Sequence, residues 1–159
     1  MKHSDALGVI LTAVEVVSVV AFIMGVYTML GVFSTTMSSS NSQSFELEMS
    51  DPVIIPIRLT PQNAGFVLAE RTVGLESEMK ATVKLLDGEN EVIAENSTVV
   101  ILPPGSREEV WLELRIPLED ALVYLGEDSD VSWETEIEVK TLFNMISFQN
   151  KMQMEGTRD

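Results

Sequence analysis

Residues 6–33 read ALGVILTAVEVVSVVAFIMGVYTMLGVF, an apolar run with a single charged side chain, Glu15. The apolar core of a signal peptide spans about 7–15 residues, whereas a helix that crosses the hydrocarbon of a bilayer needs about 20. At a rise of about 1.5 Å per residue, this run would be about 42 Å long as a helix. The residues that follow, VFSTTMSSS, contain no clean small-x-small cleavage site. We therefore predict an uncleaved transmembrane helix over residues 6–33.

Basic residues predict the orientation of this helix. Lys2 precedes it, and the next basic residue along the chain is Arg58. Because positive charge near a membrane segment marks the cytoplasmic side, residues 1–5 are predicted to be a cytoplasmic tip. The tract 34–44 (STTMSSSNSQS) is polar, uncharged and without a hydrophobic period, which predicts a flexible linker. Residues 45–156 would then form one extracytoplasmic domain of a single-pass cell-membrane protein.

Composition narrows the function of that domain. The chain has 25 acidic and 10 basic residues, a net charge of −15, and most of this charge lies beyond the linker. Such a surface repels nucleic acid and anionic lipid headgroups, so we expect neither as a ligand. The chain has no cysteine, which excludes disulfides and thiolate chemistry. Its one histidine, His3, lies on the predicted cytoplasmic tip, which argues against a histidine-based catalytic or zinc site outside.

The exported part alternates like a β-protein. In SWETEIEVK (132–140), apolar and uncharged side chains face one way and mostly acidic ones the other, as in a strand with one wet face. The same alternation occurs at SFELEM (44–49), MKATVKLL (79–86) and EVWLELRI (109–116). Asp87-Gly88 and the segment 103–105 (PPG) mark reversals between strands. After Pro117, helical spacing in LEDALVYLG predicts a short helix. The predicted fold is mainly β: an antiparallel β-sandwich with one N-terminal transmembrane helix and one short connecting helix.

Two stretches carry a family resemblance. VIIPIRLTPQNAGF (53–66) and the segment 80–117, with its Asp-Gly hairpin and PPG turn, are similar to the immunoglobulin-like or LEA14-type β-sandwiches of archaeal single-pass membrane proteins. Asn63 and Gly65 stand where the asparagine-glycine turn of that pattern would be. The resemblance implies a fold and an anchored topology, and most such proteins have no assigned activity.

Small and polar residues follow one another on the predicted transmembrane helix. Thr12, Glu15, Ser18 and Gly25 belong to a stripe with steps of mostly three or four residues, and Ala21-x-x-x-Gly25 flanks it. An ionisable group in lipid normally turns toward protein or water. The stripe therefore predicts a helix-packing interface with a protein partner or a second copy of the chain. The alternative is a lone helix with Glu15 protonated or reaching toward the near headgroups.

An apolar N-terminal helix with an early glutamate before a β-domain is also similar to type IV pilin-like subunits and to anchored sandwich proteins of the archaellum stator. In pilins the glutamate lies just after a processed basic-glycine site. MKHSDALG has no such site immediately before the helix, and Glu15 lies deeper in it.

Two further motifs carry weaker signals. GEDSD (126–130) places three carboxylates, Glu127, Asp128 and Asp130, in one loop, but it lacks EF-hand spacing, so we predict a solvated loop and no metal site. Asn96-Ser97-Thr98 is an N-glycosylation pattern that has meaning only if the domain is exported.

No motif supplies a catalytic base for the many serines and threonines, so we expect no enzyme activity and no cofactor. The sequence favours a membrane-anchored structural or protein-interaction module of the cell envelope. The alternatives are a pilin-like or archaellum-type filament or stator subunit, and a carrier of small apolar ligands inside the sandwich.

Overall fold

The computed structural model of the chain describes residues 3–40, 50–124 and 130–155, with side chains described for residues 7–37, 50–124 and 130–153. Within these ranges the elements are α1 (His3–Ser40), β1 (Val53–Leu59), β2 (Phe66–Leu68), β3 (Arg71–Val73), β4 (Ser77–Leu86), β5 (Val92–Leu102), β6 (Val110–Ile116), α2 (Leu118–Tyr124), β7 (Ser132–Thr141) and β8 (Ile146–Glu155). The mainly β fold, the long N-terminal helix and the short connecting helix are confirmed. The strand predicted at 44–49 lies outside the described residues.

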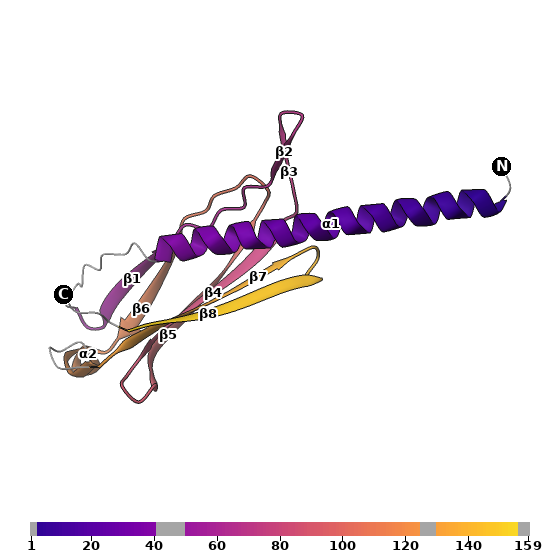
Figure 1. Cartoon of the computed structure of the whole chain (residues 1–159). Coiled ribbons are helices and arrows are strands. Elements are labelled where there is room, and N and C mark those ends of the chain that lie inside the picture. The colour runs from indigo at the N-terminus through magenta and orange to yellow at the C-terminus, as the bar shows by residue number, and fades with distance from the viewer. Residues whose placement is uncertain (1–2, 41–49, 125–129, 156–159) are drawn as a thin grey trace.

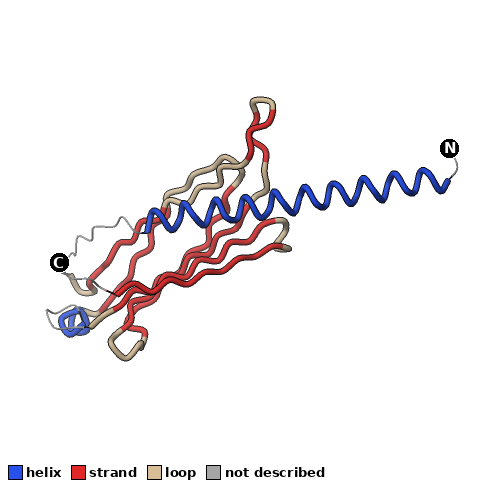
Figure 2. Tube along the Cα trace, in the orientation of Figure 1, coloured by secondary structure: helices blue, strands red, loops and turns tan. Residues whose placement is uncertain are grey.

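The strands form two facing layers and a small projecting hairpin. One layer is a sheet of four strands in the order β5-β4-β7-β8, and the other is the pair β1-β6. β2 and β3 form the separate hairpin. All of these pairings are antiparallel. Figure 2 shows the strands of both layers running roughly along the direction of α1.

Alternating side chains fill the space between the layers, as the sequence predicts. The inward positions of β1 and β6 are fully or nearly fully buried: Val53, Ile55, Ile57, Leu59, Val110, Leu112, Leu114 and Ile116. β4 contributes Met79, Ala81, Val83 and Leu85, and β7 contributes Thr135, Ile137 and Val139. Since successive side chains of a strand point to opposite faces, their neighbours along each strand face mainly solvent.

The two layers are held together differently along their two sides. On one side, β5 lies beside β6, and the side chain of Asn96 in β5 donates a hydrogen bond of 2.8 Å to the carbonyl oxygen of Glu113 in β6. On the other side, the C-terminal half of α1 contacts β1 of one layer and β7 and β8 of the other. Figure 1 shows α1 lying along this side and then extending far beyond the strands toward the N-terminus. The helix therefore closes the sandwich.

One face of the C-terminal half of α1 belongs to the core. Gly25, Thr28, Met29, Val32 and Thr36 are buried, at steps of mostly three or four residues. Next to this buried row, Phe33 packs edge-on against Phe148 of β8, with ring centroids 5.2 Å apart. The helix contributes to the same core as the strands.

The polar tract after the apolar run is helical in its first part, which corrects the prediction of a flexible linker for residues 34–40. The hydroxyl of Ser34 donates a hydrogen bond to the carbonyl oxygen of Gly31, and the hydroxyl of Thr36 donates one of 2.7 Å to the carbonyl oxygen of Val32. Thr36 Oγ1 also lies 3.3 Å from the sulfur of Met79 in β4. Hydroxyl groups that bond carbonyls one turn back are satisfied inside a helix, and contact with the domain outweighs their weak helix propensity.

The β4–β5 turn follows the predicted chemistry, whereas Asn63 does more than its predicted turn requires. The Asp87 carboxylate accepts hydrogen bonds from the backbone N–H groups of Glu89 and Glu91, at 2.9 and 2.8 Å, which closes the β4–β5 hairpin. Asn63 is fully buried, and its Nδ2 donates to the carbonyl oxygens of Leu75 and Leu102, each at 2.9 Å. This asparagine thus joins three segments instead of only shaping a turn.

Candidate functional site

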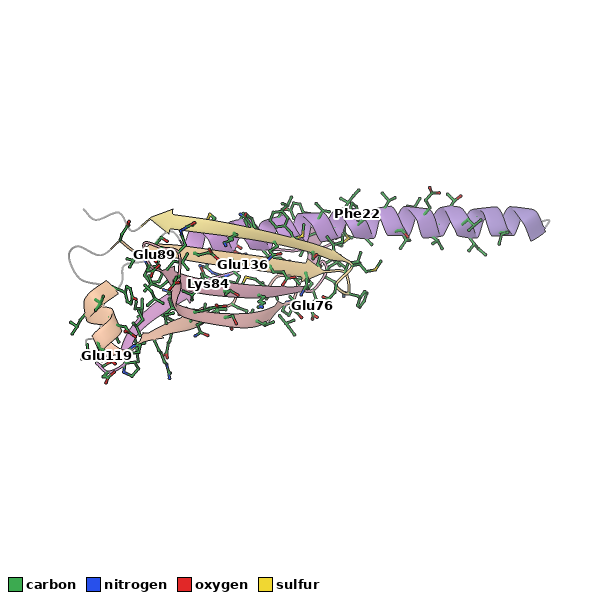
Figure 3. The ribbon with its side chains drawn as sticks, turned by 90° about the horizontal axis from the view of Figure 1, so that it is seen from below. Phe22, Glu76, Lys84, Glu89, Glu119 and Glu136 are labelled. Atoms are coloured by element: carbon green, nitrogen blue, oxygen red, sulfur yellow. The ribbon has the colours of Figure 1, made fainter. Side chains whose placement is uncertain are left out.

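The N-terminal half of α1 extends beyond the domain with its apolar side chains exposed. From Leu7 to Val20 every described side chain is exposed, and burial begins only near Gly25. The helix is long and apolar enough to cross a membrane over Leu7–Met37, by length and composition. However, its last part packs on the domain, so the segment of α1 that is free of the domain ends earlier than the apolar run. Figure 3 shows Phe22 near the level at which the domain ends.

The length of the helix indicates where a membrane-spanning segment that begins at Leu7 would end. Tyr27 follows Leu7 by twenty residues, which at about 1.5 Å each is about 30 Å of helix. The hydrocarbon core of a bilayer is also about 30 Å thick. Tyr27 is half exposed, and its ring packs on Phe66 of β2 with centroids 4.5 Å apart. Aromatic side chains with a polar tip prefer the membrane–water interface.

The structure separates the four residues of the predicted helix-packing interface. Gly25 faces the chain's own domain: a Cβ atom added there would lie 2.6 Å from Cδ1 of Ile146 and 3.5 Å from Cγ2 of Thr141. Its missing side chain thus permits close approach of α1 to β7 and β8. In this arrangement Gly25 is not available to a second helix, and this corrects the prediction for that position.

The other three residues, Thr12, Glu15 and Ser18, lie on the exposed half of α1. Ser18 bonds the carbonyl oxygen of Val14 at 2.8 Å, so its hydroxyl is satisfied within the helix. Glu15 lies near the middle of the segment between Leu7 and Met24. A carboxyl group at this place would be near the centre of a bilayer, where an ionisable side chain is most costly. Its contact with another helix stays a prediction.

Exposed apolar side chains gather at the end of the domain from which the free half of α1 departs. In the β7–β8 turn, Phe143 is 94% exposed and Met145 is 79% exposed. In the β2–β3 hairpin, Val67 is 78% exposed and Leu68 is 70% exposed. Figure 1 shows both connections on the side of the domain that faces the N-terminal half of the helix.

The β7–β8 turn holds its apolar side chains on an unusual backbone. Leu142, Phe143 and Asn144 have φ angles of 53°, 54° and 65°, and the N–H of Met145 bonds the carbonyl oxygen of Leu142 at 3.0 Å. Residues other than glycine rarely adopt positive φ, and bulky ones least of all. Backbone of this kind persists only where its surroundings maintain it, and it often marks a functional segment.

The predicted glycosylation residue, Asn96, lies within β5 and not on a loop. Its Nδ2 is the atom that donates to Glu113, and a glycan would be attached to that same nitrogen. Beside it is an open hollow of about 450 Å³, lined by Glu95, Asn96, Trp111, Glu113 and Arg115. Modification of Asn96 stays a prediction, and it would have to preserve or replace the bond that joins the two layers.

Charged groups on the domain pair across strands. Glu134, with a side chain only 7% exposed, lies 2.8 Å from Lys151 and 3.7 Å from Lys84. These residues come from β7, β8 and β4, so the cluster stabilises the register of the large sheet on its outer face. In the part of the chain that the structure describes, no group of three histidine or acidic side chains is placed to hold a metal ion. Of the predicted acidic loop, Glu127 and Asp128 lie outside the described residues, and Asp130 is exposed.

Comparison with known proteins adds only a general likeness of fold. No family model matches the chain, and no curated protein matches it. A β-glucuronidase from glycoside hydrolase family 2 matches over 69% of this chain and 11% of its own, with 14% identity and a TM-score of 0.42. A protein from Arabidopsis thaliana, solved in solution, matches over 72% and 76%, with 14% identity and a TM-score of 0.41. A protein from Archaeoglobus fulgidus matches over 73% and 93%, with 10% identity and a TM-score of 0.41.

All three have β-rich matching parts, and the chain spans about a tenth of the length of the β-glucuronidase. Likenesses at this level assign neither a family nor an activity. The LEA14-type, archaeal and pilin-like resemblances stay predictions.

Sequence reasoning missed the apolar end of the domain. A signal was present, because LFNMI (142–146) follows a strand of strict alternation and places leucine, phenylalanine and methionine where a turn usually has polar residues. The hairpin residues Val67 and Leu68 give a weaker signal, since a short apolar sequence is equally typical of an exposed strand and of a buried strand.

We predict that Gly25→Leu destabilises the domain by about 1–3 kcal/mol, since the new side chain has to displace Ile146. Ile146→Ala should relieve much of that cost, so the double variant should be more stable than the sum of the single effects predicts. The measurement is urea unfolding of the full chain in a non-denaturing detergent, followed by tryptophan fluorescence. Gly8→Leu is the matched control, because a Cβ at Gly8 meets nothing within 4 Å. Additive effects at Gly25 and Ile146 would contradict the contact.

Proposed function

We propose that this chain is a non-enzymatic, membrane-anchored β-sandwich that acts as a structural or protein-interaction module of the cell envelope. The observation that carries the proposal is the division of α1 into two halves. One half has the length and apolar surface of a membrane span, and the other half is part of the core of the domain. The domain would therefore be held against one face of the membrane by a continuous helix, and not by a flexible linker.

The orientation follows from charge. Lys2 before the helix and the absence of basic residues between it and Arg58 favour a cytoplasmic N-terminus and an extracytoplasmic domain. The predicted resemblance to archaeal immunoglobulin-like or LEA14-type anchored sandwiches supports the same arrangement. An interaction role is supported by Glu15, whose carboxyl group at mid-membrane depth is best satisfied by a donor on a neighbouring helix.

A second candidate is a subunit of a pilin-like or archaellum-type filament or stator. The unbroken path of α1 from the free half into the domain favours it, because a rigid helix would transmit helix-to-helix packing directly to the position of each domain. The carrier of apolar ligands has less support, since Met29 and Val32 of α1 and the strand side chains occupy the space between the layers.

Topology is tested with single cysteines, which are unique because the chain has none. Glu89→Cys lies in the exposed β4–β5 turn, and we predict that a membrane-impermeant maleimide labels it in intact cells. His3→Cys, at the N-terminal end of the helix and therefore on the other side of the membrane in this proposal, should be labelled only after the cells are permeabilised. The reverse pattern would contradict the proposed orientation.

The role of Glu15 is tested by association. Glu15→Leu should leave membrane insertion intact, because it removes a costly polar group from lipid. It should weaken association by about 0.6–2 kcal/mol, since an interhelical hydrogen bond is lost. The measurement is the yield of crosslinked oligomers in native membranes at matched expression, with Val16→Leu as the control.

Equal crosslinking of wild type and Glu15→Leu would show that α1 is only an anchor. Mass spectrometry of the mature N-terminus separates the two candidates further, because cleavage before Ala6 would favour the filament subunit.

A further inference from the structure

We propose that the β7–β8 turn and the β2–β3 hairpin insert their exposed apolar side chains into the surface of the bilayer that α1 crosses, so that the domain docks directly on lipid. This inference rests on the proposed membrane anchor. It adds a second lipid contact, made by residues 142–145 and by Val67 and Leu68.

The position of the turn along the helix supports this docking. β8 begins at Ile146, whose side chain lies against Gly25, and the turn that precedes it extends toward the free half of α1. Figure 3 shows the end of β7 and the start of β8 close to the level of Phe22. If the hydrocarbon spans about 30 Å from Leu7, its boundary lies near Tyr27. Tyr27 is about five residues C-terminal to Phe22, so the tip of the turn lies on the lipid side of this boundary. The tip of the turn would then reach the depth of about 5–10 Å that interfacial segments occupy.

The hairpin lies near the same boundary. The ring of Phe66, at the start of β2, packs on Tyr27, so the hairpin leaves the domain beside the residue that we place at the interface. Val67 and Leu68 are exposed beyond this contact. Glu70 in the hairpin turn and Arg71 beside it are exposed as well and carry opposite charges, so the hairpin would lie among the headgroups while the β7–β8 turn reaches the apolar layer.

The chemistry of the turn fits lipid better than water. Phe143 is almost fully exposed, and its backbone is held at positive φ together with its two neighbours. In water, the exposed aromatic ring gains no apolar contact that could offset the strain of this backbone. In an interfacial layer, the same geometry presents the aromatic ring and Met145 to an apolar environment.

Charge identifies the kind of membrane surface. Glu76 and Glu78 line a hollow of about 250 Å³ beside the turn, together with Leu75, Ile101, Lys140 and Phe143. Lys140 is paired with Glu138 at 3.1 Å, so it does not offset these carboxylates. Docking would therefore be driven by apolar insertion into a zwitterionic surface, and anionic headgroups would weaken it.

The experiment uses the full chain in phosphatidylcholine vesicles, with an environment-sensitive fluorophore on a single cysteine. Met145→Cys reports the turn, Glu89→Cys reports the opposite end of the domain, and Val17→Cys reports the helix. At position 145 we expect blue-shifted emission, which is quenched by lipids that carry a nitroxide near the headgroup. At position 17 we expect quenching by lipids that carry a nitroxide deep in the acyl chain. At position 89 we expect water-like emission. Adding Phe143→Ser should cause loss of the shift at 145, whereas Leu122→Ser with Val123→Ser on α2 should not.

Each other outcome overturns the docking. Water-like emission at 145 with deep quenching at 17 would leave the anchor intact and refute the lipid contact. Water-like emission at both positions would refute the anchor, and the docking with it. A shift at 145 that lipid nitroxides do not quench, and that disappears when the protein is diluted into more lipid, would identify a second copy of the chain as the partner.

Discussion

The packing of the C-terminal half of α1 along the open side of the two layers of strands is the contact on which the rest of the structure depends. Among the residues that the structure describes, the four-stranded sheet and the β1–β6 pair share no ladder of backbone hydrogen bonds. On one side they meet through β5 and β6, and on the other they meet through the helix. Val32 is fully buried and Met29 nearly so, which makes the helix part of the core and not an attachment to it. Burial of two such side chains is worth about 3–6 kcal/mol, a large fraction of the stability of a domain of this size.

This packing also determines how the domain sits relative to whatever surrounds the free half of the helix. Because α1 is one continuous helix from its exposed half into its buried half, the distance from the exposed half to the end of the domain is constant. The proposed membrane contact, the proposed helix partner at Glu15 and the docking of the β7–β8 turn all follow from that one continuity. A domain on a flexible linker would have none of these relations.

The sequence predicts β4, β6, β7 and the turn at Asp87-Gly88, since strict alternation and turn residues act over short distances, but it gives no prediction for β2, β3 or β8. It fails where a residue's role depends on a partner far along the chain. Ser34 and Thr36 are typical of linkers, and only contact with the domain shows why they are helical. Gly25 has the spacing of a helix–helix contact, but the element that needs the close approach is β8. Asn63 has the pattern of a turn residue, but its buried amide joins segments that are distant in sequence.

The claim that the second half of α1 is part of the domain is tested most directly by comparing two fragments, residues 25–159 and residues 41–159, in urea unfolding. The longer fragment keeps the buried face of the helix and should unfold in a single cooperative transition. The shorter one should be about 3–6 kcal/mol less stable or fail to fold, because the open side of the sandwich loses Met29, Val32 and their neighbours. Equal stability of the two fragments would show that the sandwich is complete without the helix, and would contradict the central role given to α1.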